Sequence, residues 1–137
     1  MNSEYEGGCH CGAVRYTVTK APESTFYCHC QDCQKTTGSP FSVEMMIEDS
    51  GFDIEGALMS YVVTGDSGKP VSRWHCSNCS SGIYLTCEAD PGYIFLKVGT
   101  LDDPGLASSE MHIYASNRQP WLNFDDKLPS YEKAPEG

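Results

Sequence analysis

Basic residues, long apolar runs and helical segments are all scarce in this sequence of 137 residues. Nine Lys and Arg stand against nineteen Asp and Glu, which gives a formal net charge of −10. Such a charge repels the phosphate backbone of nucleic acids and the anionic surface of a membrane. No apolar run approaches the roughly 20 residues that cross a bilayer as a helix. We therefore expect no nucleic-acid partner and no membrane association.

The start of the chain has little that resembles an export signal. Its first eight residues lack both a basic start and an apolar core. We therefore expect a cytoplasmic protein. The length suits a single domain with a core of its own, predicted here over residues 1–137.

Helical periodicity is nearly absent, and alternating β-type segments take its place. They are rich in Val, Ile, Tyr, Phe and Thr and are separated by Gly, Pro and Asp. This pattern predicts a mainly β fold with strands at residues 12–19, 24–28, 41–47, 52–55, 58–64, 71–75, 83–87, 93–100 and 110–115. One short helix is expected at 31–37, ending at Gly38. The tail reads as an extended arm anchored by Trp121, Leu122 and Phe124.

The sequence is, in contrast, well supplied with cysteine. Seven of its eight cysteines fall into three groups, at Cys9 and Cys11, at Cys28, Cys30 and Cys33, and at Cys76 and Cys79. Disulfides are disfavoured because no export signal is present and because cysteines one or two residues apart are badly placed to pair. Clustered thiolates are instead typical zinc ligands.

Structural zinc takes four ligands, so a C-x-x-C pair needs a second pair to complete its tetrahedron. Cys9 and Cys11 can provide it, because residues two apart on an extended segment point the same way. We therefore expect Cys9, Cys11, Cys76 and Cys79 to close one zinc site.

The remaining cluster, Cys28, Cys30 and Cys33, offers three sulfurs and leaves one position open. Three protein ligands and an open position are typical of a reactive zinc. Two zinc ions per chain are therefore expected. In a rival grouping, Cys30 and Cys33 join Cys76 and Cys79 as a zinc ribbon, although the spacer is longer than usual.

The other candidates are weaker. His29 lies between two proposed ligands and could carry a proton beside the open position, although a supporting or surface role is the simpler interpretation. His75 could be a fourth ligand to the three-cysteine zinc. Cys87 has no partner at metal spacing and is interpreted as a buried small residue, and His112 as a packed or surface residue. Trp74 and Trp121 are expected in the core or a groove, and the adjacent Asp125 and Asp126 as solvated carboxylates.

Three thiolates and one Zn²⁺ sum to a charge of −1, which makes such a zinc a weak activator of water. The ion is better suited to binding an incoming thiol, whose pKa it lowers. An anionic thiol would need nearby cations, for which Lys35 and Arg118 are the candidates, both otherwise ordinary surface charges.

Several runs together resemble the glutathione-dependent formaldehyde-activating enzyme family. They are spread over nearly the whole chain and lie at residues 7–16, 28–33, 37–41, 75–84, 98–104, 112–114, 120–121 and 128–129. The resemblance implies an Mss4-like fold of antiparallel sheets with zinc-binding knuckles. It also implies a structural zinc on Cys9, Cys11, Cys76 and Cys79 and a catalytic zinc on Cys28, Cys30 and Cys33. The implied activity is that of a carbon–sulfur lyase, which joins formaldehyde reversibly to glutathione.

Two functional hypotheses follow. The first is a zinc-dependent carbon–sulfur lyase acting on a small thiol or a glutathione adduct. The alternative is a zinc-stabilised protein-binding module without catalytic activity, since a fold does not fix a function. A redox role for Cys30 and Cys33 is a third reading, which zinc binding would mask.

Overall fold

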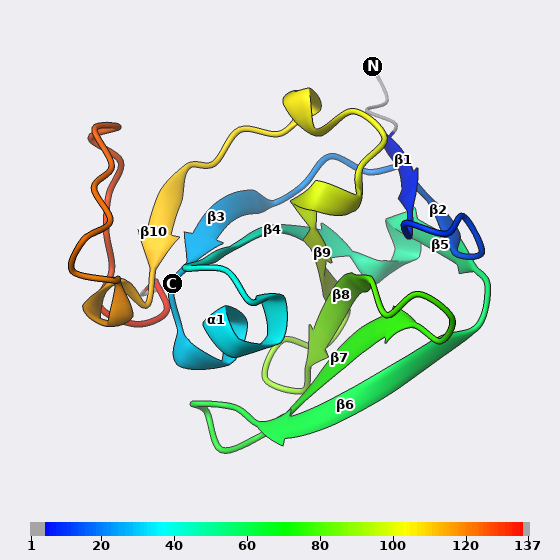
Figure 1. Ribbon diagram of the computed structural model, residues 1–137, viewed down its shortest axis with the longest axis horizontal. Helices are drawn as coiled ribbons and strands as arrows, with labels where there is room; N and C mark the ends of the chain where they lie inside the picture. The colour runs from blue at the N-terminus through cyan, green and yellow to red at the C-terminus, as the bar shows by residue number, and fades with distance from the viewer. Residues whose placement is uncertain (1–4, 136–137) are drawn as a thin grey trace.

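The computed structural model describes residues 5–135, which form two β-sheets and one short helix. A three-stranded sheet has the order β1-β2-β5, and a seven-stranded sheet has the order β10-β3-β4-β9-β8-β7-β6 (Figure 1). The strands are β1 Tyr5–Gly8, β2 Arg15–Val18, β3 Ser24–Cys28, β4 Ser42–Glu48, β5 Phe52–Glu55, β6 Leu58–Thr64, β7 Pro70–Cys76, β8 Gly82–Cys87, β9 Tyr93–Lys97 and β10 Met111–Ile113. The helix α1 spans Gln31–Thr37, and short 3₁₀ turns occupy Asp49–Gly51, Val98–Thr100, Pro104–Leu106 and Ala115–Asn117.

The mainly β, antiparallel fold predicted from the alternating pattern is confirmed. Within the described residues, every pair of named strands is antiparallel apart from β10, which runs parallel to β3. A long connection after β9 returns the chain to the far edge of the sheet, where Met111 pairs with Phe26. Among residues 5–135, no helix has the length and apolar character needed to cross a membrane.

Strand β1 was missed by the pattern because half of it is glycine. Gly7 lies directly against the ring of Tyr16 and the carbonyl oxygen of Thr100, where any Cβ would collide. The strand therefore depends on close backbone approach and not on β-forming side chains. The prediction at 12–19 begins too early, because Gly12 sits at a φ of +85° in a turn and pairing starts only at Arg15.

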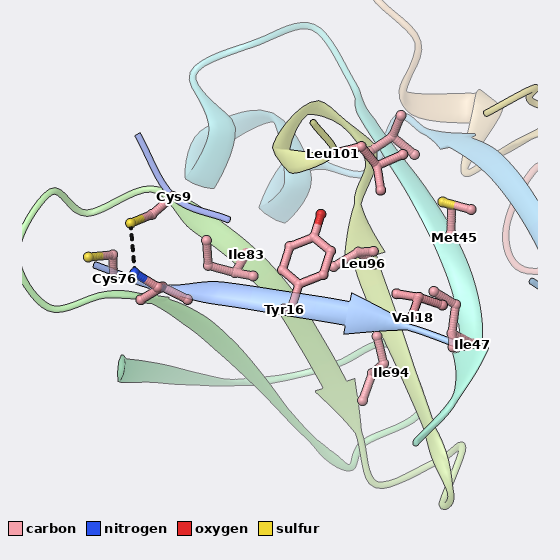
Figure 2. Close-up of a cluster of buried hydrophobic side chains, with 12 residues drawn as sticks. Cys9, Tyr16, Val18, Met45, Ile47, Cys76, Ile83, Ile94, Leu96 and Leu101 are labelled. Carbon is pink, nitrogen blue, oxygen red and sulfur yellow. Dashed lines mark hydrogen bonds between the residues drawn. The ribbon is translucent and has the colours of Figure 1, made fainter. Parts of the chain in front are cut away.

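The main core lies between β2 and the large sheet. Val14, Tyr16 and Val18 occupy alternate positions and belong to one buried cluster with Ile83 and Leu96. Figure 2 shows the ring of Tyr16 between Ile83 and Leu96. The same cluster includes Cys9 and Cys76, whose sulfurs lie at one end of it. A second apolar cluster contains Phe26, Cys28, Cys33, Leu85, Phe95 and Ile113. Each group of metal-type cysteines is therefore built into a hydrophobic cluster.

The C-terminal tail follows the predicted arm only in part. Trp121 is 64% exposed, so its expected anchoring or core role was wrong. Phe124 is the anchor, because its ring packs against Tyr27 and His112. Beyond it, the backbone N–H of Tyr131 donates to the carbonyl of His112 at 2.9 Å and ties the tail to β10.

Gly56, between β5 and β6, gives a first prediction. It has a φ of +114°, and an added Cβ would lie 2.4 Å from the Ala13 carbonyl oxygen and 2.8 Å from the Cα of Val14. Gly56→Ala is expected to destabilise the fold by about 3 kcal/mol through strain and overpacking. Gly99→Ala is the control, since among the described residues nothing lies within 4 Å of its added Cβ. Urea unfolding measures both, and equal midpoints would contradict the prediction.

Candidate metal centres and an adjoining cavity

The first cysteine cluster lies where the β1–β2 connection meets the β7–β8 connection. The sulfurs of Cys9, Cys11, Cys76 and Cys79 all lie within 4.8 Å of one another. The Sγ of Cys11 is 3.5 Å from that of Cys9 and 3.8 Å from that of Cys76. A tetrahedral zinc with Zn–S bonds of about 2.3 Å has its sulfurs about 3.8 Å apart. These spacings therefore fit one four-coordinate zinc.

Backbone donors surround the same sulfurs. The N–H of Val14 donates to the Sγ of Cys9 at 3.2 Å, as the dashed line in Figure 2 marks. The N–H groups of Asn78 and Cys79 donate to the Sγ of Cys76 at 3.3 and 3.4 Å. A contact with the Ser81 hydroxyl lowers the pKa of Cys79 to about 5. Such N–H···S contacts stabilise thiolates and are the usual support of a zinc knuckle.

The second cluster is formed where β3 passes into α1. Cys28 ends β3, Cys30 is the N-cap of α1, and Cys33 lies in its first turn. Their sulfurs lie within 4.8 Å of one another, with 3.4 Å between those of Cys28 and Cys33. The thiols of Cys28 and Cys33, together with the N–H of Cys33 at 3.2 Å, lower the pKa of Cys30 to about 3. Cys30 is therefore suited to bind a metal ion as a thiolate.

The structure keeps the two clusters apart. The sulfurs of Cys30 and Cys33 group with Cys28 and not with the C-x-x-C pair of the β7–β8 turn, which favours the predicted division over the zinc-ribbon grouping. Among the described residues, neither cluster includes a histidine, which counts against His75 as a fourth ligand. His75 instead lines a separate cavity beside Trp74, which confirms the groove position expected for Trp74.

The three-cysteine cluster lines a cavity of about 390 Å³, a size common for small-molecule sites. Most of its wall is apolar, provided by Phe26, Met46, Val71, Leu85, Phe95 and Ile113. Cys87 also lines this cavity and is half-buried, and burial followed by the charge of Asp90 raises its pKa to about 11. Cys87 is thus a neutral thiol outside both clusters. It was expected to be a buried small residue and is only half-buried.

A buried charged group lies against the cysteines. The carboxylate of Glu44 is 4% exposed and accepts hydrogen bonds from the Lys97 ammonium at 2.6 Å and the Ser42 hydroxyl at 2.8 Å. Its Oε2 is 3.8 Å from the Sγ of Cys33. Burial raises the pKa of Glu44, and the charge of Lys97 opposes this. On the other side, an Arg73 guanidinium nitrogen is 4.0 Å from the same sulfur.

Tyr114 adds a proton-bearing group to the cavity wall. It follows β10 and holds a left-handed φ of 53°, which is uncommon for an aromatic residue and frequent at functional positions. Burial, followed by the nearby charges of Asp66 and Cys28, raises the pKa of Tyr114 to about 12. Its hydroxyl therefore keeps its proton at neutral pH and can donate a hydrogen bond into the cavity.

His29 does not line this cavity. It is fully buried, and its Nε2 hydrogen-bonds the Nδ1 of His112 at 2.9 Å. The Nε2–H of His112 donates to the carboxylate of Asp126 at 2.9 Å. Asp126 is exposed, as expected of a solvated carboxylate, but is also hydrogen-bonded to this buried ring. Burial, followed by His112 and Arg118, lowers the pKa of His29 to about 4. This geometry favours a role for His29 in fixing the Cys28–Cys30 segment over the proton-carrier role.

Asp126 gives a second prediction. Asp126→Ala leaves the buried imidazole of His112 without its carboxylate and should lower the melting temperature at pH 7. The Leu128 N–H, then His112, hold the pKa of Asp126 below its usual value, so its contribution is present above about pH 4 and is lost as pH falls through the folded pKa. The exposed neighbour gives the control, Asp125→Ala, which should change little. Thermal melts at pH 7 and pH 3 test this, and equal losses at both pH values would contradict it.

Comparisons with known proteins identify the family of this chain. A family model described as glutathione-dependent formaldehyde-activating enzyme matches residues 4–117. The chain belongs to this family. A relative from Halomonas elongata, provisionally named after the same activity, is 24% identical over 128 residues, which cover 89% of this chain and 82% of its own.

Two fungal relatives with the same provisional name match over shorter stretches. The protein from Sordaria macrospora is 28% identical over 56% of this chain, and that from Emericella nidulans is 30% identical over 60%. The matched parts span only 34% and 42% of those longer proteins. A crystal structure of a Rhodobacter sphaeroides protein has a TM-score of 0.58 at 20% identity and covers 76% of this chain and 96% of its own. That likeness supports the fold.

Three groups in the cavity escaped the sequence analysis, namely Glu44, Arg73 and Tyr114. None of them left a usable signal, because Glu44 alternates with Met45 and Ile47 along β4, which is the pattern of a solvent-facing position, and yet it is 3% exposed. The cations that were named, Lys35 and Arg118, do not line the cavity. Arg118 instead lies 5.4 Å over the ring of Phe124.

Proposed function

We propose that this chain is a zinc-dependent enzyme that forms and breaks a carbon–sulfur bond between a thiol and an aldehyde carbon. The observation that carries the proposal is the set of three sulfurs, from Cys28, Cys30 and Cys33, which lie within 4.8 Å of one another on the wall of a small-molecule cavity. The family name adds formaldehyde as the aldehyde and glutathione as a first thiol to test.

The donor set fits zinc, since three clustered thiolates are soft ligands. Bound there, the ion supplies Lewis acidity that lowers the pKa of a thiol ligand. We further propose that Cys9, Cys11, Cys76 and Cys79 hold a second, structural zinc, which gives two ions per chain.

The residues of the chain provide the remaining functions. In the forward direction a thiol sulfur bonds to the aldehyde carbon, the thiol loses its proton and the carbonyl oxygen gains one, which gives a hydroxymethyl thioether. Tyr114 can donate a hydrogen bond to that oxygen, because it faces the cavity and keeps its proton. Arg73 stabilises negative charge on the sulfurs, from 4.0 Å at Cys33. The apolar wall excludes water from the reacting atoms.

The test mixes zinc-loaded protein with formaldehyde and a thiol and follows exchange between free and adduct forms by NMR. We expect faster exchange than in buffer at the same pH, and a slower rate for Tyr114→Phe. An exchange rate equal to that of buffer for every thiol tried would refute the proposal.

One observation favours the alternative of a protein-binding module. Strand β6 is the outer edge of the large sheet, and its Met59, Tyr61 and Val62 are 55–60% exposed. An apolar edge strand of this kind can accept another strand. The two functions separate on zinc removal from the three-cysteine cluster. In a binding module this zinc would be structural, so its loss should unfold the chain. In the enzyme the fold should survive and thiol chemistry should stop.

A further inference from the structure

We infer that the cavity selects small thiols that are uncharged or carry an ammonium group, and discriminates against thiols that carry carboxylates, glutathione included. The inference rests on the proposed function and concerns the same site. Its basis is the placement of charges around the cavity in a chain whose formal net charge is −10.

The mouth of the cavity carries carboxylates. Asp32, Asp66 and Asp90 all line it, from the start of α1, the β6–β7 turn and the segment after β8. Two of them act electrostatically on groups in the wall, Asp66 on Tyr114 and Asp90 on Cys87. An anionic ligand would approach through this rim against repulsion, which partly apolar surroundings screen less than bulk water.

The charges inside the cavity are already matched. The described lining holds one cation, Arg73, and one buried carboxylate, Glu44, which Lys97 contacts at 2.6 Å from outside the lining. Arg73 faces the cysteine sulfurs, whose three thiolates with one Zn²⁺ would carry a single negative charge. When Lys97 is counted with the described lining, these charges cancel, and the three carboxylates of Asp32, Asp66 and Asp90 remain. A neutral Glu44 would change the total by one unit and leave it negative.

A second cavity, which shares Arg73 with the first, has a different lining. It measures about 670 Å³, and among the described residues its lining holds Arg73, Lys97 and several hydroxyls but no carboxylate. That composition would suit an anion. However, no cysteine from the described residues lines it, so a thiol that reaches the sulfurs lies in the acidic cavity. The apolar wall there, formed by groups such as Phe26 and Phe95, also offers no partner to an extended peptide backbone.

The experiment measures dissociation constants by titration calorimetry for three thiols of matched size. These are 2-aminoethanethiol, 2-mercaptoethanol and mercaptoacetate, each added to zinc-loaded protein at low ionic strength. We expect mercaptoacetate to bind at least about tenfold more weakly than 2-aminoethanethiol, given two or three carboxylates near the ligand. Glutathione should resemble mercaptoacetate.

A charge variant removes the effect of differing thiol pKa values. Asp66→Asn with Asp90→Asn should strengthen mercaptoacetate binding about tenfold relative to 2-mercaptoethanol, through removal of two nearby charges. Asp49→Asn with Asp125→Asn makes the same change in net charge away from the cavity lining and should leave the ratio unaltered. Each thiol is compared with itself across the proteins.

The outcomes separate the two proposals. If thiols bind but mercaptoacetate and glutathione bind as tightly as the others, or the ratio is the same in both double variants, the charge selectivity is overturned and the proposed function stands. If no thiol binds to the zinc-loaded protein, the proposed function falls and the selectivity falls with it.

Discussion

Cys76→Ser is expected to abolish the cooperative unfolding of this protein. Cys76 is 1% exposed, and its sulfur lies both in the four-cysteine cluster and at the end of the main core. Loss of a structural zinc removes a binding free energy of about 10 kcal/mol or more in small zinc domains, which is comparable to the whole stability of a typical domain. Circular dichroism melts and zinc analysis by mass spectrometry measure the outcome.

The matched control lies one residue away. Ser77 is exposed and contributes its backbone N–H, not its side chain, to a hydrogen bond with the carbonyl of Ala57. Ser77→Ala should therefore melt within about 0.5 kcal/mol of the wild type, as surface changes usually do. A Cys76→Ser protein that folds normally with two zinc ions would show that this cluster is not a structural site.

Cys33→Ala should leave a folded chain with one zinc ion and no measurable thiol–aldehyde exchange. Unlike Cys76, Cys33 belongs to the smaller apolar cluster, which is separate from the main core. Losing a methylene-sized group and a ligand there should cost about 2–3 kcal/mol, and exchange should fall more than about a hundredfold, since even the supporting residues of metal sites are worth 10–100-fold. The zinc content, the melting temperature and the thiol–aldehyde exchange rate are all measured on the same variant protein.

Cys87→Ala is the control in the same cavity. Its thiol lies outside both clusters, so zinc content should remain at two and exchange should change by less than about threefold. Loss of folding together with the metal in Cys33→Ala would favour the protein-binding module, because the cluster would then be structural.

The sequence predicted nine of the ten described strands and the spatial grouping of the cysteines because both follow local rules. Alternation places Val14, Tyr16 and Val18 on one face, and the sulfur groups follow from short spacings that chain geometry restricts. The same reasoning located α1, whose predicted bounds match those observed, because Gly38 takes the left-handed conformation that ends it.

The cavity could not be predicted in this way, because its wall comes from segments far apart in the chain. Glu44 and Tyr114 reach the cysteines through the pairing of β3 with β4 and with β10, and Arg73 through the succession of β7, β8, β9 and β4. The spacing of these three residues in the sequence therefore does not indicate that they meet. The link from His112 to Asp126 was missed for the same reason, since it depends on how the tail folds back.

The four-cysteine cluster also bears on how the protein is made. The sulfurs of Cys11 and Cys76 lie 3.8 Å apart although 65 positions separate them, so the site cannot close until the ribosome has released the β7–β8 turn. Until then, Cys9 and Cys11 have no partner cysteines, and the main core, which includes Cys76, is incomplete. Closing so long a loop is costly in entropy and slow when contacts are this distant. Zinc can therefore complete this site only after Cys79 has left the ribosome, so its supply from that point on should govern the yield of folded protein.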